Sequence, residues 1–208
     1  MRILLLSPHT DDIELGAGGL VSRLQEEGGH VFRWLVFSRC EDSLPAGMPP
    51  DTLEREFLAS AEVYGIADTE VFNFAVRTMP SYRQEILETL VATRREFKPD
   101  MVIAPCTHDV HQDHATIAAE AVRAYKSSAT LLGYELPWNN LAFDSTVLVR
   151  LTKDHMWRKW EAMQQYSSQL ALGRDYFSWE FVQSWGRSRG VQCGAEYAEA
   201  FEVIRAIW

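Results

Sequence analysis

Short apolar runs alternate along the chain with longer segments in which apolar residues recur every three or four positions. This alternation is typical of a parallel sheet whose strands are connected by helices, and it argues against a helix bundle or a two-sheet sandwich. Strands are predicted at residues 2–7, 31–38, 69–74, 101–105, 130–135 and 146–151. The pattern therefore predicts an α/β fold.

Two of the intervening helices carry boundary signals. Asp51 followed by Glu54 predicts a capping box at the start of one helix, and Gly65 predicts the end of that helix. Ser81 followed by Gln84 predicts a second capping box at the start of the next helix.

Composition restricts the expected partners. With 208 residues, 47% of them hydrophobic and 24% charged, the chain is long enough for one well-packed core, and we expect a single domain over residues 1–208. Its formal net charge of -9 argues against nucleic acid or anionic lipid, because phosphate binding depends on clustered Lys and Arg. A small molecule is the expected partner, and a homo-oligomer is left open.

The cysteines and the N-terminal segment indicate a cytoplasmic protein. Cys40, Cys106 and Cys193 are an odd number of cysteines at unrelated spacings, which argues against a disulfide framework and for a reducing compartment. The apolar run before Ser7 covers about four residues, fewer than the ~7–15 of a signal-peptide core and far fewer than a membrane span. Cys106, near His108, is expected to be a small buried hydrophobe and not a thiol nucleophile.

Polar residues with metal-binding chemistry follow the first and the fourth predicted strand. The two clusters consist of His9, Asp11 and Asp12 after the first strand and His111, Asp113 and His114 after the fourth. In the common doubly wound strand order, 3-2-1-4, those two strands are neighbours, and ligands bind in the crevice between their carboxyl ends. Neutral imidazole and carboxylate are ligands that zinc accepts, so a catalytic metal site is the leading interpretation.

Three of these side chains fit a catalytic zinc, which keeps three protein ligands and one position for water. His9, Asp12 and His114 supply that set. Of two adjacent carboxylates only one points easily at the ion, so Asp11 is expected to act on water as a general base. His111, three residues before His114, would face the developing oxyanion or the leaving group.

Asp113 has two expected roles, and the sequence leaves both open. Its carboxylate could hold the His111 imidazole in the protonated form, or it could cap the helix that begins near Ala115. Asp12 could also be no more than a helix N-cap, although a place among the metal ligands is favoured.

The glycine-rich segment at residues 16–19 raises the alternative of a dinucleotide-binding protein. The G-x-G-x-x-G fingerprint fails at its last position, where Val21 stands. Asp11, Asp12 and Glu14 would also place negative charge where a pyrophosphate binds. We expect these glycines to let the helix pack close to the sheet and to leave room beside the metal.

Six of the seven tryptophans lie between Trp138 and Trp208. Met156, Trp160 and Met163 fall at helical spacing, so core packing is the favoured interpretation of this region. Sugar stacking and a subunit interface are the alternatives.

Both polar clusters and their flanking residues resemble the LmbE-like, or PIG-L, family of metal-dependent N-deacetylases. The matching segments are Ser7–Gly16 and Asp109–His114, with further similarity at Tyr134–Pro137 and Arg189–Phe201. These segments follow one another in family order over nearly the whole chain. The pair of motifs is specific, whereas either motif alone is a weak signal.

The resemblance implies a Rossmann-like three-layer sandwich with a mostly parallel sheet and helices on both faces. It implies Zn2+, or another divalent ion such as Fe2+, held by His9, Asp12 and His114. It also implies Asp11 as the general base and His111 as the group that faces the oxyanion. Family substrates are mostly N-acetylglucosamine units attached to another group, so the expected activity is hydrolysis of an acetamido group to acetate and a free amine.

The chain departs from the family pattern in places. Thr10 stands where proline is usual, and both residues suit an extended turn. Leu53 stands where some relatives carry an arginine that contacts substrate, so that contact is not expected here. The membrane anchor of lipid-acting eukaryotic relatives is absent, which favours a soluble substrate. The alternative is a non-catalytic carbohydrate- or metal-binding module, and Asp11 argues against it because metal binding alone does not require that carboxylate.

Overall fold

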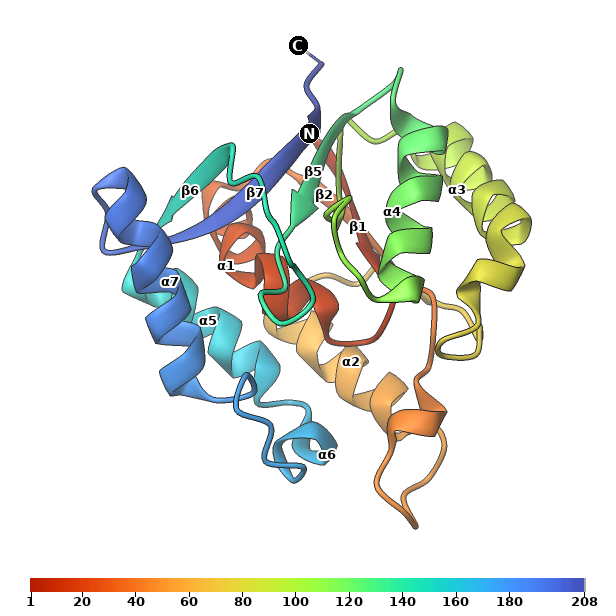
Figure 1. Ribbon diagram of the computed structural model, residues 1–208, viewed down its shortest axis with the longest axis horizontal. Helices are drawn as coiled ribbons and strands as arrows, with labels where there is room; N and C mark the ends of the chain where they lie inside the picture. Colours follow the sequence, from red (N-terminus) through yellow and green to blue (C-terminus); the bar gives the residue numbers. More distant parts are fainter. Residues whose placement is uncertain (208) are drawn as a thin grey trace.

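A seven-stranded sheet forms the centre of the computed structural model, which describes residues 1–207 (Figure 1). Its strands are β1 (Arg2–Ser7), β2 (Val31–Val36), β3 (Thr69–Val71), β4 (Met101–Pro105), β5 (Thr130–Tyr134), β6 (Val147–Leu151) and β7 (Tyr197–Arg205). They lie in the order β3-β2-β1-β4-β5-β7-β6, with β1 to β5 parallel and β7 antiparallel to both of its neighbours. The predicted mostly parallel sheet is confirmed, and the sheet contains the 3-2-1-4 order that was assumed for this fold class.

Helices cover both faces of the sheet. The longer helices are α1 (Asp12–Glu27), α2 (Thr52–Val63), α3 (Arg83–Phe97), α4 (Gln112–Tyr125), α5 (Lys153–Met163) and α7 (Trp179–Cys193). The short ones are α6 (Ser167–Leu170) and the 3-10 helices η1 (Glu41–Ser43) and η2 (Met79–Tyr82). In Figure 1, α3 and α4 lie on one side of the sheet, and α1, α2, α5 and α7 lie on the other. This is the predicted three-layer sandwich.

Alternate residues of β1 enter two separate hydrophobic cores. Ile3 and Leu5 pack with apolar residues of α1, α2 and α5, whereas Leu4 and Leu6 pack with those of α3 and α4. All four side chains are fully buried. Burial on both faces explains why β1 is a continuous apolar run without polar alternation.

All six predicted strands form, and a seventh, β7, was not predicted. The strands expected at 31–38 and 69–74 end earlier than predicted, at Val36 and Val71. β7 was missed because Glu199 interrupts its apolar pattern. In the fold Glu199 is buried, where it accepts hydrogen bonds from two backbone N–H groups of α1 and from Lys159.

Both predicted capping boxes are wrong. Asp51 precedes α2, but its side chain makes no capping hydrogen bond and pairs instead with Arg55, 3.2 Å away. Ser81 lies inside η2, and α3 begins only at Arg83. Gly65, with a φ of 70°, follows the end of α2 as expected.

Two glycines allow α1 to lie close to the sheet. A Cβ atom on Gly16 would overlap the ring of Tyr134 on β5, and a Cβ atom on Gly19 would overlap Leu151 on β6. The expectation that these glycines serve packing is confirmed. Their contact fixes the N-terminus of α1 beside the carboxyl end of β1, where the first polar cluster lies.

The Trp-rich part of the chain is mixed in its burial. Met156 and Met163 are buried and Trp160 packs against the same core, which confirms the predicted core face. Trp138 and Trp157, in contrast, are 39% and 45% exposed.

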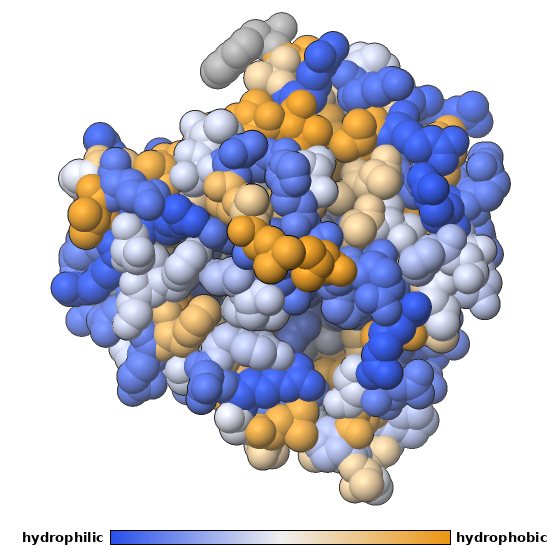
Figure 2. All heavy atoms as spheres, viewed as in Figure 1, coloured by the Kyte–Doolittle hydropathy of each residue, from blue (hydrophilic) through white to orange (hydrophobic). Residues whose placement is uncertain are grey.

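On the face shown in Figure 2, apolar side chains form small groups among polar ones. Within the described part of the chain, no helix is both long and apolar enough to cross a membrane, and the cytoplasmic location stays a prediction.

Candidate active site

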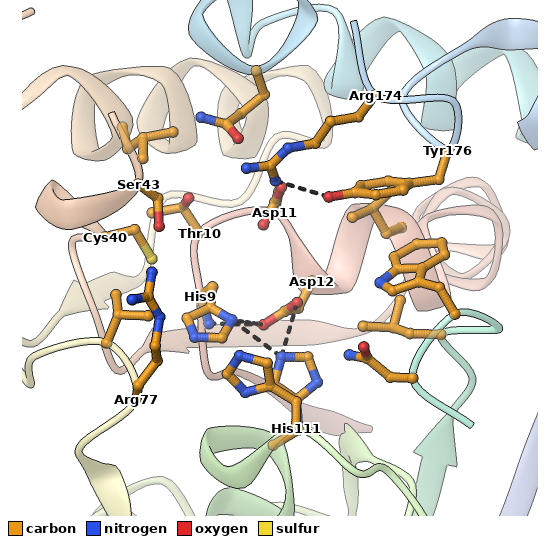
Figure 3. A pocket seen from close by; sticks show the side chains of 18 residues that line it. His9, Thr10, Asp11, Asp12, Cys40, Ser43, Arg77, His111, Arg174 and Tyr176 are labelled. Carbon is orange, nitrogen blue, oxygen red and sulfur yellow. Dashed lines mark hydrogen bonds and ion pairs between the residues drawn. The ribbon is translucent and has the colours of Figure 1, made fainter. Parts of the chain in front are cut away.

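The loops after β1 and β4 meet at the carboxyl edge of the sheet, as the strand order predicts. These two strands are parallel neighbours. A cavity of about 290 Å³ opens at this edge, and five of the six predicted site residues line it (Figure 3). We call these five the metal-facing cluster: His9, Asp11, Asp12, His111 and His114. The sixth, Asp113, is buried behind them.

Three predicted metal ligands converge on one point of the cavity. Nδ1 of His9 lies 3.1 Å from Nε2 of His114. The carboxylate oxygens of Asp12 lie 3.4 Å from these same nitrogen atoms, Oδ2 from His9 and Oδ1 from His114. The backbone N–H of His9 donates to Asp12 Oδ2 at 2.7 Å and so orients the carboxylate. His111 also offers a ring nitrogen within 4.8 Å of those of the other two imidazoles.

His9 and His114 each contact a buried carboxylate on the side of the imidazole that is remote from the cavity. Oδ2 of Asp113 lies 3.1 Å from Nε2 of His9, and Oδ2 of Asp109 lies 2.8 Å from Nδ1 of His114. Each carboxylate accepts the ring N–H remote from the cavity, so the nitrogen that faces the cavity keeps its lone pair. The donor set therefore fits a divalent metal ion. Asp109 had no predicted role, although it begins the second motif.

Asp113 neither holds His111 nor caps a helix, so both sequence-based roles are corrected. Asp113 lies inside the first turn of α4, where its carboxylate accepts the backbone N–H of Arg77 at 2.6 Å and that of Met79 at 3.2 Å. The N-cap of α4 is His111, whose Nδ1 accepts the backbone N–H of Asp113 at 3.3 Å. Because only an unprotonated nitrogen accepts a hydrogen bond, this contact favours neutral His111 with its proton on Nε2.

The adjacent carboxylates of the site have opposite pKa shifts. Burial and the charge of Asp12 raise the pKa of Asp11 to about 6. Burial also acts to raise the pKa of Asp12, but the imidazoles of His114 and His9 outweigh it and hold that pKa well below its usual range. Burial and the same two imidazoles lower the pKa of His111. An ionised Asp12 suits a metal ligand, whereas an Asp11 that exchanges its proton near neutral pH suits a base.

The loop between β1 and α1 is fixed by a buried tyrosine. The Tyr166 hydroxyl lies 2.6 Å from the Thr10 carbonyl oxygen and 2.7 Å from Oε1 of Glu14, which also accepts from Ser60. Burial raises the pKa of Glu14 to about 8, so its carboxyl group is neutral at pH 7. The backbone of Thr10 is therefore anchored without the proline that is usual at this position.

Of the thirteen other residues that line the cavity, four offer an aromatic ring or a guanidinium group, and sequence analysis assigned a site role to none of them. We call them the aromatic–arginine wall: Arg77, Trp138, Arg174 and Tyr176. Trp138 stacks on Tyr176 with ring centroids 4.1 Å apart and planes inclined by 17°. Arg174 donates to the Tyr176 hydroxyl at 2.8 Å. The wall comes from the loops after β3, β5 and α6, and its only sequence signal was the tryptophan enrichment that left sugar stacking open.

Cys106 is the buried hydrophobe that the sequence predicts. It is fully buried, and Nδ2 of Asn140 donates to its sulfur atom at 2.9 Å. Burial raises the pKa of the thiol to about 11, which keeps it protonated at neutral pH.

Known proteins similar to this chain point to one family. The PIG-L family, described as GlcNAc-PI de-N-acetylase, matches residues 4–125. A protein of Escherichia coli K12 named uncharacterized deacetylase YaiS is 26% identical over 175 residues, which cover 80% of this chain and 90% of that protein. Diacetylchitobiose deacetylase of Thermococcus kodakarensis is 25% identical over 120 residues, which cover 54% of this chain and 45% of that enzyme.

The conserved protein TT1542 of Thermus thermophilus has the same fold. Its solved structure superposes with a TM-score of 0.82 at 25% identity, over 99% of this chain and 96% of that one. The family match covers more than half of the 208 residues and includes both polar clusters. The chain therefore belongs to the PIG-L family.

Proposed function

We propose that this protein is a metal-dependent N-deacetylase that hydrolyses the acetamido group of an N-acetylglucosamine-type sugar or glycoconjugate to acetate and a free amine. The observation that carries the proposal is a further carboxylate, Asp11, beside a converged set of metal ligands. His9, Asp12 and His114 are sufficient to bind a metal, so metal binding alone gives no role to the Asp11 carboxylate. Membership of the PIG-L family and the deacetylase names of two relatives support the same activity.

His9, Asp12 and His114 would hold the metal ion, which we propose to be zinc, with ferrous iron as the alternative. When bound, such an ion polarises the amide carbonyl and lowers the pKa of water beside it. Asp109 and Asp113 keep the two imidazoles in the tautomer and orientation that the ion requires.

The proton transfers fall to residues of the chain itself. Asp11, partly exposed to the cavity, takes a proton from water as the water oxygen attacks the acetamido carbon. The C–N bond then breaks, and Asp11 gives the proton to the leaving nitrogen. His111, neutral with its proton on Nε2, donates a hydrogen bond to the oxyanion that forms during the attack.

The exposed ring of Trp138 supports a sugar as the carrier of the acetamido group. Stacking on Tyr176 holds this ring in a fixed orientation at the cavity. A fixed aromatic face gives a sugar ring a large contact area at little entropic cost. Because a non-catalytic sugar-binding module would use the same surface, the ring supports the substrate class and not the reaction.

Incubation with a panel of N-acetylated sugars, with free amine as the readout, tests the proposal. Zinc-loaded protein should release amine from at least one of them. Asp11→Asn should lower that rate by roughly 10²–10⁴ while metal content stays at the wild-type level. Asp154→Asn, which changes an exposed carboxylate on α5 outside the cavity, is the matched control and should keep the wild-type rate. Metal-loaded protein that binds sugars and releases amine from none would overturn the proposal and favour a binding module.

A further inference from the structure

Arg77 presents an unpaired positive charge to the cavity. It belongs to the loop between β3 and η2, and its side chain lines the cavity together with His9 (Figure 3). Within residues 1–207, no carboxylate lies within 4.0 Å of its guanidinium nitrogen atoms. The chain as a whole carries a formal net charge of -9, so partners for an arginine are abundant elsewhere. The unpaired guanidinium is therefore available to a ligand in the cavity.

The backbone of Arg77 adopts a conformation that residues with a side chain rarely take. Its φ is 69°, in the left-handed region that glycine occupies without steric cost. The buried carboxylate of Asp113 holds this conformation by accepting the N–H groups of Arg77 and Met79. Glycine would satisfy the same hydrogen bonds with less strain, so the loop geometry alone does not explain an arginine here. Strained residues of this kind concentrate at functional sites.

The same carboxylate connects Arg77 to the proposed metal ligands. Oδ2 of Asp113 lies 2.6 Å from the backbone nitrogen of Arg77 and 3.1 Å from Nε2 of His9. The backbone of Arg77 is thus fixed relative to the His9 imidazole. A substrate group bound by Arg77 would be held at a defined position relative to the acetamido group in the metal-facing cluster.

Arg174, the other arginine of the aromatic–arginine wall, lies on a different side of the cavity in Figure 3. It donates to the Tyr176 hydroxyl, and its charge acts on Asp11, opposing the larger effect of burial on the pKa of that carboxyl. The guanidinium of Arg174 therefore already interacts with Tyr176 and Asp11. Arg77 has no corresponding partner among the residues of the cavity.

We propose that Arg77 binds an anionic group, a carboxylate or a phosphate, that the substrate carries in addition to its N-acetyl group. This inference rests on the proposed deacetylase function and narrows its substrate class. A planar guanidinium offers two parallel N–H donors, and both carboxylate and phosphate accept them as a pair. Neutral N-acetyl sugars lack that contact.

Calorimetric titration of the zinc-loaded protein tests the proposal without depending on turnover. The ligands are three amino sugars of the product type: glucosamine 6-phosphate, muramic acid and neutral glucosamine. Wild type should bind at least one of the two anionic sugars roughly 10- to 100-fold more tightly than glucosamine. The phosphate and the carboxylate are separate arms, so the result also identifies the anion. Failure of the deacetylation panel would not alter this binding preference, so the two proposals fail separately.

Arg77→Gly is the decisive variant, because glycine suits a φ of 69° and the loop should keep its fold. The ratio of the affinity for the anionic sugar to that for glucosamine should fall to about 1 in Arg77→Gly. In Arg77→Lys this ratio should stay above 1 but below the wild-type value. Arg95→Gln, which changes an exposed arginine on α3 outside the cavity, is the matched control and should keep the full preference. A wild type without a preference for either anionic sugar would overturn the proposal. An unchanged preference in Arg77→Gly would overturn it as well.

Discussion

The metal-facing cluster and the aromatic–arginine wall enclose one cavity but are supported in different ways. The cluster comes from two loops, each running from a buried strand into a helix, and buried Asp109 and Asp113 hold two of its imidazoles. The wall comes from three separate loops, and its aromatic pair, Trp138 and Tyr176, is held by mutual stacking and by the hydrogen bond from Arg174 to Tyr176, with no buried carboxylate behind it among residues 1–207. Side chains held by buried partners at strand ends suit bond-breaking chemistry, whereas the partly exposed side chains of the wall suit recognition.

This difference predicts two classes of variant. Changes in the metal-facing cluster or its supporting carboxylates should slow the reaction with every substrate or weaken metal binding. Changes in the wall should alter substrate affinity and leave the chemical step nearly intact.

After Asp11→Asn, His111→Ser should give the largest loss, a decrease in kcat of roughly 10²–10³, because the donor to the oxyanion is removed. Serine is a favoured N-cap, so it can replace the capping role of His111 at the start of α4. Metal content and the thermal midpoint should stay close to those of wild type. A variant with normal kcat on all active substrates would place His111 outside the chemistry.

Asp109→Asn should weaken metal binding by roughly 10- to 100-fold, measured by competition with a chelator. The carboxylate of Asp109 accepts from both the His114 ring and the backbone N–H of His111, and an asparagine has only one oxygen for these donors. Asp154→Asn serves again as the control. Unchanged metal affinity in Asp109→Asn would show that the hydrogen bond between Asp109 and His114 does not contribute to metal binding.

Trp138→Ala should have a smaller effect, an increase in KM of roughly 3- to 10-fold with kcat within about twofold of wild type. Trp157→Ala removes an exposed tryptophan of α5 outside the cavity and should leave both constants unchanged. A loss confined to kcat in Trp138→Ala would contradict the separation between recognition and chemistry.

Cys106→Ala should have the smallest effect, with activity within about twofold of wild type, because the thiol does not line the cavity. Burial raises its pKa from 9.0 to about 11. The unfolded chain therefore ionises this thiol first, and its contribution to stability declines as pH rises from about 9 to 11. Mass spectrometry after maleimide treatment at pH 8 should show Cys106 unmodified while the half-buried Cys193 reacts. Rapid labelling of Cys106 would contradict its burial.

The convergence of the metal-facing cluster was predictable because both of its motifs are local. His9 and Asp12 follow the apolar run of β1 directly, and His111 and His114 follow β4. The alternation of strands and helices then makes β1 and β4 neighbours, which brings the two motifs to one edge of the sheet. Their chemical roles are not fixed by this convergence and stay predictions.

The remaining features depend on register and on contacts between distant segments. Whether Asp113 caps α4 or supports His9 from behind the site depends on where that helix begins, and composition alone does not determine this. β7 was not predicted because the charged Glu199 interrupts its apolar pattern. The partners of this carboxylate on α1 and α5 become known only from the fold. The cavity position of Arg77 likewise depends on a hydrogen bond to a residue of another loop.

The most direct test of the central claim is a crystal structure of the zinc-loaded protein with anomalous data collected at the zinc absorption edge. The account predicts one strong anomalous peak in the cavity, bound by Nδ1 of His9, Nε2 of His114 and the carboxylate of Asp12, with Asp11 free of the ion. A peak bound by Asp11 in place of Asp12, or an empty cavity in crystals of protein that releases amine, would contradict it.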